Sequence, residues 1–378
     1  MTVDNNELRL VNLTDPSQIR VTHENNYAAW GSGLTLEQYF QREKVFASQP
    51  ATRDGKLTFW ALQKYDPAAD KWIIVSHMES LTRRAFYKVQ GLPVGETVSH
   101  GIGSVFTPAQ NRGQGYAAVM LKQASEKLDN WNNQSLDSSA NDYSFNVLWS
   151  DVGNYYAKFD YHVTDTKEIK FIIETNDVAW PEGVASVGVE DVAALSAQDV
   201  KQIHAEIDKA TEADGATRLA IVPEEMVYEP AFRRAQFLAP YLSKASTKEP
   251  PTVFGAKHGG CWILWTQDFA NDKVTCLRMF ADNTLSKQQT LESADLLIRA
   301  AISNAVKWNL PAFNLWVQDI PSQLTVEDVS AYFNRTPIKG VTSKIHNRPD
   351  SWPMVRYHNG KDPQNQIKWV YDGKYGWF

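Results

Sequence analysis

The six residues from Arg112 to Ala117 have the types and spacing that bind a diphosphate. They follow the apolar run Val105-Phe106-Thr107 and precede an apolar stretch with helical spacing. Small residues at 113, 115 and 117 let a ligand approach backbone N–H groups, where the positive end of a helix dipole favours an anion. The pattern predicts a diphosphate-binding turn made of Arg112, Gly113, Gln114, Gly115, Tyr116 and Ala117.

Pro108 marks the end of the strand that leads into this turn. A proline cannot donate a ladder hydrogen bond, so it suits a point where a strand parts from its neighbour and leaves backbone groups available. The glycines also fit a loose dinucleotide motif, G-x-G-x-x-A. That motif expects a second strand with an acidic end about 20 residues on, where this chain has an Asn- and Ser-rich tract at 130–141. A tight turn without a ligand is a third interpretation.

The elements around the turn are expected to be a helix, antiparallel strands, the turn, a second helix and further strands. Residues 36–47 have the spacing of an amphipathic helix after the caps Ser32 and Thr35. Residues 66–70 carry the Pro and Asp of a hairpin turn. Apolar runs predict strands at 58–65, 72–78, 98–107, 145–149 and 169–173.

Two domains are expected from the length of 378 residues, because single domains usually have roughly 100–200. A Pro- and Gly-containing stretch at 179–183 separates an N-terminal domain at 1–178 from a C-terminal domain at 184–378. At 282–286 the second half lacks exposed glycines and an adjacent arginine, so we expect no second cofactor there. A similar order of elements recurs in that half, with strands at 252–265, 274–280 and 313–317 and a helix at 288–308.

The motif residues resemble the GNAT superfamily of N-acetyltransferases, whose R/Q-x-x-G-x-G/A motif is matched by Arg112 to Ala117. Leu148 to Tyr161 is similar to the family's next strand and helix, and Tyr156 takes the family's tyrosine position. Asp160 stands where the family usually has glycine, so we expect a different turn and a differently aimed Tyr161. The resemblance implies an α/β (α+β) fold: a GNAT-like mixed sheet flanked by helices, then a second, degenerate GNAT-like domain.

Gly103 to Pro108 and the aromatic chain end resemble the fungal acetyl-CoA:L-lysine N-ε-acetyltransferases of lysine catabolism. The resemblance implies acetyl-CoA as cosubstrate and direct transfer to the side-chain amine of free L-lysine. Two alternatives stay open: a GNAT enzyme for another small amine or a protein lysine, and a non-catalytic module that senses acyl-CoA.

The same resemblance assigns roles to residues around the turn. Val105, Phe106 and Thr107 are expected to pair their backbone with the pantetheine arm, which orients the thioester. Tyr156 is expected to donate a proton or a hydrogen bond to the departing sulfur.

The acceptor amine must lose a proton before it attacks, and the sequence leaves the base ambiguous. Glu79, at the end of the strand 72–78, and His100, on the strand that leads to Val105, are both placed to line the acceptor pocket. Asp151 is a candidate for gripping an ammonium, and Trp149 is expected in the same substrate site.

The aromatic chain end suggests a docked terminus, because chain ends otherwise fray. We expect Trp377 and Phe378 to insert into the first domain and bring the terminal carboxylate near the acceptor amine. Arg83 and Arg84 could bind the acceptor's carboxylate or belong to a solvated loop.

Composition and charge exclude several classes of partner. The net charge of -6 and the absence of a Lys/Arg-rich run argue against nucleic acid. No stretch reaches the about 20 apolar residues of a membrane span, and the polar start lacks targeting signals, so a cytoplasmic protein is expected. The eight histidines lack H-x-x-x-H spacing, so no metal is expected. Cys261 and Cys276 could be cross-strand neighbours, but free buried thiols are favoured.

Overall fold

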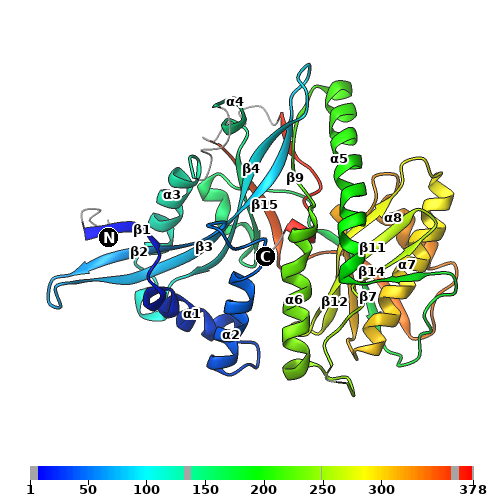
Figure 1. The fold of residues 1–378 in the computed structure, drawn as a ribbon, viewed down its shortest axis with the longest axis horizontal. Helices are drawn as coiled ribbons and strands as arrows, with labels where there is room; N and C mark the ends of the chain where they lie inside the picture. The colour runs from blue at the N-terminus through cyan, green and yellow to red at the C-terminus, as the bar shows by residue number, and fades with distance from the viewer. Residues whose placement is uncertain (1–6, 132–137, 248, 359–365, 377–378) are drawn as a thin grey trace.

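The computed structural model describes residues 7–131, 138–247, 249–358 and 366–376, which form two mixed sheets with helices packed on them (Figure 1). The first sheet contains nine of the described strands, in the order β1 (Leu8–Leu13), β2 (Leu57–Asp66), β3 (Lys71–Lys88), β4 (Gly95–Phe106), β5 (Phe145–Ser150), β15 (Trp352–Tyr357) and β6 (His162–Val163), with β9 (Thr217–Ile221) paired to β3 and β16 (Ile367–Trp369) paired to β9.

The second sheet contains seven of the described strands and lies beside α5 and α6 (Figure 1). Its order is β14 (Val341–Asn347), β7 (Lys167–Ile173), β13 (Ala312–Trp316), β12 (Lys273–Ala281), β11 (Cys261–Asp268), β10 (Gly255–His258) and β8 (Ala185–Val187). The helices are α1 (Pro16–Trp30), α2 (Leu36–Ala47), α3 (Tyr116–Leu128), α4 (Ser138–Asn141), α5 (Val192–Asp214), α6 (Glu225–Leu242), α7 (Lys287–Lys307) and α8 (Val326–Phe333).

The two sheets exchange strands across the expected domain boundary. Strand β7 was expected in the first half, yet its buried Ile169 and Phe171 pack in the second sheet between β13 and β14. In return β9, β15 and β16 complete the first sheet. The division into 1–178 and 184–378 stays a prediction, but neither sheet is built from one side of it alone.

Several elements match their predicted ranges closely. Helix α2 spans 36–47, and Thr35 caps it through a reciprocal capping box with Gln38. The turn at 67–70 joins β2 and β3 as an antiparallel hairpin. Strand β3 is much longer than predicted, and the predicted run at 252–265 is divided by the positive-φ glycines Gly259 and Gly260.

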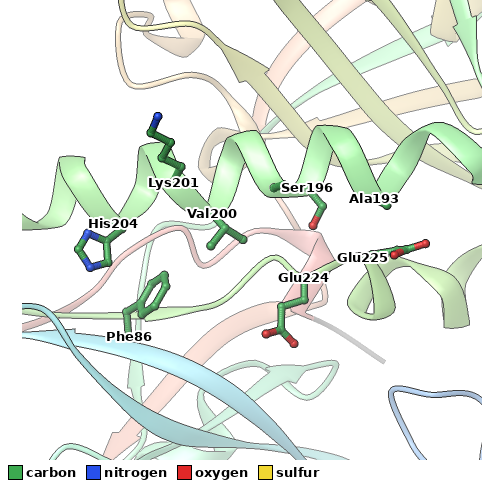
Figure 2. A pocket seen from close by; sticks show the side chains of 9 residues that line it. Phe86, Ala193, Ser196, Val200, Lys201, His204, Glu224 and Glu225 are labelled. Atoms are coloured by element: carbon green, nitrogen blue, oxygen red, sulfur yellow. The ribbon is translucent and has the colours of Figure 1, made fainter.

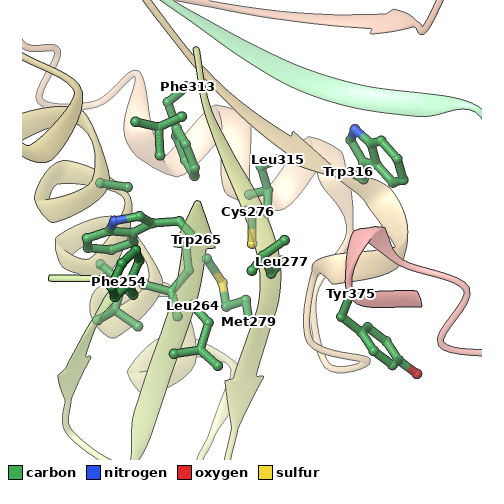
Figure 3. Packing of buried hydrophobic residues seen from close by; sticks show 14 of the residues in the cluster. Phe254, Leu264, Trp265, Cys276, Leu277, Met279, Phe313, Leu315, Trp316 and Tyr375 are labelled. Carbon is green, nitrogen blue, oxygen red and sulfur yellow. The ribbon is translucent and has the colours of Figure 1, made fainter. Parts of the chain in front are cut away.

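The core of the second sheet is aromatic and includes the end of the chain (Figure 3). Phe171 stacks on Phe313 with ring centroids 5.5 Å apart, and Tyr375 packs against the same cluster from η7 (Lys374–Gly376). Cys276 lies opposite Trp265 and Cys261 opposite Ala281, so the two cysteines are not cross-strand neighbours. Both are free and buried.

One buried ion pair connects α5 to the second sheet. Asp199 on α5 receives two hydrogen bonds from Arg278 on β12, each 2.8 Å long. Asp199 is fully buried and Arg278 is 4% exposed. Separately, none of the helices in the described ranges has both the length and the apolar character needed to cross a membrane.

Candidate functional site

Strands β4 and β5 run parallel and then part, and β4 ends shortly before Pro108. Their pairing extends from Ser99 opposite Phe145 to Ile102 opposite Leu148. Strand β4 continues to Phe106, while the end of β5 pairs with β15 on its other side. A bulge at Ser104, whose φ is +51°, redirects β4 within this segment. Residues 103–106 therefore have one backbone edge without a strand partner in the described part of the chain.

The glycine turn follows directly and ends at the start of α3. Gly113 and Gly115 have φ of +78° and +80°, which glycine adopts without strain, and Gly115 occupies the N-cap position. The carbonyl of Gly115 accepts the amides of Ala118 and Val119. The amides of residues 113–117 come before these two bonds, and none of them donates to a backbone carbonyl of the described turns and loops.

The turn fits a diphosphate in space and in charge. A Cβ built on Gly113 or Gly115 meets no atom within 4 Å, so the space in front of both residues is open. Arg112 is exposed, and its Nε donates to the carbonyl oxygen of Thr107 at 3.0 Å, which fixes the guanidinium beside the turn. Open space, unpaired amides and a fixed positive charge together suit the pyrophosphate of acetyl-CoA.

We expect Gly115→Ala to weaken coenzyme A binding by about tenfold or more, because its Cβ would enter the space that the phosphates need. Gly183→Ala is the matched control, since Gly183 also has a positive φ, +75°, and open space around it but lies far along the chain from the turn. Each variant should lose about 1–2 kcal/mol of stability from backbone strain. Calorimetric titration with coenzyme A checks the prediction, and equal affinity of both variants contradicts it.

Tyr156 lies in η3 (Gly153–Phe159), close to the point where β4 and β5 part. It packs in the same hydrophobic cluster as Ile102, Leu148 and Tyr116. Burial raises the pKa of the Tyr156 phenol, so the hydroxyl stays protonated at neutral pH. A protonated phenol beside the parted strands is able to donate a proton to a leaving group.

The turn after η3 keeps the conformation of a glycine turn, contrary to our expectation. Asp160 adopts the left-handed region with φ +64° and ψ +24°, which aspartate tolerates better than most residues. Tyr161 is consequently directed inward, is 1% exposed and packs against Tyr156.

Glu79 and His100 do not line one pocket, because they lie on opposite faces of the first sheet. Glu79 pairs with Gly103 across β3 and β4, whereas His100 pairs with Thr82 and so points to the other side. His100 donates to or accepts from Thr82 Oγ1 at 3.1 Å, and it faces Asp129 after α3. Burial lowers the pKa of His100 to about 4. His100 is therefore separated from the candidate acceptor side.

Glu79 lies in the middle of β3 rather than at a strand end, and it directly neighbours the parted segment of β4. Its side chain is 5% exposed, and Oε1 has no hydrogen-bond partner among the described residues. Burial, and then the charge of Glu43, raise the pKa of Glu79 to about 8, while a hydrogen bond with Ser104 acts in the other direction. A carboxyl group with a pKa near neutrality suits a general base.

Sequence reasoning missed His23 and Glu43, which the fold brings to Glu79. One ligand-type atom from each of the three side chains lies within 4.8 Å of the others. Glu43 could have been found, because it lies between Tyr39 and Phe46 on the buried face of α2. His23 belongs to α1, which the sequence analysis did not predict.

The other predicted site residues lie apart from this cluster. Asp151 is exposed and accepts hydrogen bonds from Ser351. Trp149 is 8% exposed and packs against Trp369 in the larger core. Their substrate role stays a prediction, and Phe378 lies outside the described residues.

Arg83 and Arg84 belong to β3 and not to a loop. The buried Arg83 donates to the carbonyl oxygens of Tyr375 and Gly376, which anchors the chain end on the first sheet. Arg84 is exposed and pairs with Glu96 and Glu224.

A separate cavity of about 430 Å³ lies where α5 meets β3 and the start of α6 (Figure 2). Phe86 and His204 meet edge to face at its wall, with ring centroids 5.5 Å apart. It shares no lining residue with the glycine turn or with the Glu79 cluster, so we do not assign the acceptor to it. Its lining residues are Phe86, Ala193, Ser196, Ala197, Val200, Lys201, His204, Glu224 and Glu225.

The second sheet repeats the parting of parallel strands but fills the gap. Strands β12 and β13 share only two register pairs, at Val274 and Thr275 of β12. The chain end η7 contacts β12 beyond them. Ser286 caps α7 through its own side chain. The absence of a second cofactor stays a prediction, and these contacts give it a physical basis.

Comparison with known proteins gives a family match over the larger part of the chain. The model of the LYC1 GNAT-like C-terminal domain matches residues 168–378, and this match begins inside β7. A lysine acetyltransferase of Yarrowia lipolytica is 27% identical over 98% of this chain and 100% of its own length. An uncharacterized protein of Saccharomyces cerevisiae is 23% identical over 97% of this chain and 96% of its own length.

Two solved structures share the fold. A GCN5-related N-acetyltransferase from Anabaena variabilis has a TM-score of 0.52 and 12% identity, over 93% of this chain and 73% of that one. A conserved protein of unknown function from Enterococcus faecalis, described as a probable N-acyltransferase, has a TM-score of 0.50 and 12% identity, over 94% of this chain and 73% of that one. These likenesses confirm the expected mixed α/β fold with two sheets flanked by helices.

Proposed function

This chain belongs to the family of the LYC1 GNAT-like C-terminal domain and is an acetyltransferase of the GNAT type, and from this premise we propose that it acetylates the side-chain amine of free L-lysine. The Yarrowia lipolytica relative, whose name is lysine acetyltransferase, supports this acceptor. We place the reaction in lysine degradation in the cytoplasm, with acetyl-CoA as cosubstrate.

The observation that carries the proposal is the position of Glu79. A buried carboxyl group with an unpartnered oxygen lies directly beside Gly103, where β4 begins to part from β5. An amine that reached the parted edge would therefore meet a base with a pKa near neutrality. A site that only sensed acyl-CoA would not need such a group.

Acetyl-CoA supplies an acyl group that is activated as a thioester. In our proposal the turn from Arg112 to Ala117 binds its pyrophosphate, and the free edge of Val105, Phe106 and Thr107 orients the pantetheine arm. Glu79 removes a proton from the acceptor amine, and Tyr156 donates one to the thiolate that leaves.

A thiol-release assay tests the function directly. Acetyl-CoA is supplied with a panel that contains L-lysine, L-ornithine, polyamines and a lysine-containing peptide. We expect L-lysine to give the highest kcat/KM of the panel. Faster release with the peptide or a polyamine would reassign the acceptor, and tight coenzyme A binding without release for any member would indicate a sensor.

We expect Tyr156→Phe to lower kcat by about 100-fold, because the phenylalanine ring packs equally well but has no proton to give. Affinity for coenzyme A should stay within twofold, since the turn is unchanged. Tyr155→Phe is the matched control, because Tyr155 is the adjacent tyrosine and is 36% exposed. Unchanged turnover of the Tyr156 variant across the pH range would remove the proton-donor role.

A further inference from the structure

Three hydrogen-bond acceptors converge on one point from three separate elements. His23 comes from α1, Glu43 from α2 and Glu79 from β3, and one ligand-type atom of each lies within 4.8 Å of the other two. Helices α1 and α2 pack beside each other near the first sheet, and α6 lies against α2 (Figure 1). The cluster therefore lies between these helices and β3, which pairs with the edge of β4 opposite the parted one.

The cluster contains buried polar atoms that have no hydrogen-bond partner among the described residues. Glu79 is 5% exposed, and its Oε1 has no hydrogen-bond partner among the described residues. The Nε2 atom of His23 is also buried and without a partner in the same ranges. Buried polar atoms without partners are costly, so such atoms on two members of one cluster indicate that a polar ligand completes it.

We propose that His23, Glu43 and Glu79 form a cradle that binds the acceptor's side-chain amine in its ammonium form and presents it to the thioester. A primary ammonium has three N–H donors in tetrahedral directions. Donor–acceptor distances of about 2.8 Å place the three acceptors about 4.6 Å apart, which the observed cluster accommodates. This inference rests on the proposed function and specifies how that site selects a primary amine.

The surrounding charges give the two carboxylates different roles. Arg42 donates to Glu43 Oε1 through Nε and Nη2, at 2.8 and 2.6 Å, so Glu43 forms an ion pair with Arg42. Glu79 instead forms a hydrogen bond with Ser104 of β4, and the charges of Arg42 and the buried Arg234 of α6 act on it more weakly than this bond. Glu43 therefore binds the charge of the ammonium, and Glu79 is the member that takes the proton.

The proton and electron balance is complete without a further reactant. One N–H bond of the ammonium breaks, its electron pair stays on nitrogen, and an O–H bond forms on Glu79. The nitrogen pair then forms the N–C bond to the acetyl carbon as the C–S bond breaks, and the sulfur takes a proton from Tyr156. The acetylated nitrogen then loses its second proton, which returns through solvent to the Tyr156 oxygen, and Glu79 releases the first proton to solvent. The overall products are the amide, the free thiol and one proton.

A divalent cation is the competing occupant, and the neighbouring charges oppose it. Glu43 already receives two charged hydrogen bonds from Arg42, and the Arg234 guanidinium is buried close by. A metal ion would add two positive charges beside these groups, whereas an ammonium adds one and can lose it as a proton.

Calorimetric titration of the coenzyme A complex with L-lysine and with L-norleucine tests the cradle, because norleucine is lysine without its side-chain amine. We expect the wild type to prefer lysine by about 100-fold or more. Glu43→Gln should reduce this preference by about 10- to 100-fold and leave the affinity for norleucine unchanged, since one charge-assisted hydrogen bond is lost. His23→Leu should reduce the preference for lysine by about tenfold. Glu37→Gln is the control, because Glu37 is an exposed glutamate on α2, the helix of Glu43, and this variant should keep the full preference.

Different outcomes separate this inference from the proposed function. If the wild type acetylates lysine but Glu43→Gln and His23→Leu keep the full preference while remaining folded by thermal melting, the cradle is wrong and the function stands. If the panel assay selects another amine and both variants weaken that amine, the function is wrong and the cradle stands. Zinc or another divalent metal bound at one equivalent, with activity lost on chelation, would overturn the ammonium assignment.

Discussion

Glu79→Gln is expected to lower kcat with acetyl-CoA and L-lysine by about 10²- to 10⁴-fold and to make the protein more stable at alkaline pH. Glutamine keeps the shape of the side chain and can still bond Ser104, but it cannot accept a proton from the amine. Turnover should therefore fall while coenzyme A binds as before. Steady-state kinetics with saturating acetyl-CoA measure the loss.

The gain in stability follows from the sign of the pKa shift. Burial raises the pKa of Glu79 from 4.5 to about 8, so between these values the folded state binds more protons than the unfolded state. The stability of the wild type should therefore decrease as pH rises from about 5 to 8, because the buried carboxylate must ionise. Glu79→Gln should remove this decrease and be more stable than the wild type by a few kcal/mol at pH 8 to 9, with little difference near pH 5.

Urea unfolding of both proteins between pH 5 and 9 measures this difference, and Glu37→Gln serves as the control for an exposed glutamate on α2. The two parts of the prediction are independent. If the variant gains stability but has normal turnover, Glu79 is a buried carboxyl group with a raised pKa but is not the base. A slow variant with an unchanged stability profile would mean that Glu79 ionises freely in the folded protein.

The conformation of the glycine turn could be predicted from the sequence because its determinants are local. The end of β4 before Pro108, two glycines with positive φ and the start of α3 all lie within about ten residues, so no distant contact was needed. The helix at 36–47 was predicted for the same reason, through its cap at Thr35 and its apolar spacing.

Glu79 was a candidate base from the sequence, but its surroundings could not be predicted because they depend on register and on a polar helix. Side chains alternate across a sheet, and bulges in β3 and β4 shift that alternation, so the sequence did not show that Glu79 and His100 lie on opposite faces. Helix α1 buries only the polar Thr22 and Asn26, which leaves no apolar periodicity to detect.

The exchange of strands between the sheets was equally hidden. Helix α6 contains Pro230 and Pro240, and prolines in a sequence predict the end of a helix rather than its interior. This helix, which lies beside the second sheet, was therefore not predicted. Strand β7 precedes the expected boundary but finds its partners in β13 and β14, more than a hundred residues later. Long-range pairing of this kind leaves no local signal.

Arg278→Met is expected to lower the free energy of unfolding by about 3–5 kcal/mol, the largest loss of stability that we predict. The change leaves the Asp199 carboxylate fully buried without its two hydrogen bonds. The double variant Asp199→Leu/Arg278→Met should recover most of the loss, because no unpaired charge remains. Arg84→Met, which breaks the pairs of the exposed Arg84 with Glu96 and Glu224, should cost about 1 kcal/mol or less.

Chemical unfolding of these variants measures the loss of stability. Calorimetric titration with coenzyme A then measures whether coenzyme A binding at the first sheet depends on the second sheet. The pair joins α5 to β12, beside the chain end that Arg83 anchors on the first sheet.

If loosening this junction also weakens coenzyme A binding, the glycine turn depends on the second sheet for its shape. If stability falls by the expected amount but coenzyme A affinity is unchanged, the turn and the parted strands hold their geometry within the first sheet alone. We expect the second result, because the contacts described around the turn come from β4 and the loop after it, β5, η3 and α3, which all belong to the first sheet or pack on it. A stability loss in Arg278→Met no larger than that in Arg84→Met would contradict the prediction. It would mean that the Asp199 carboxylate finds another partner when Arg278 is replaced.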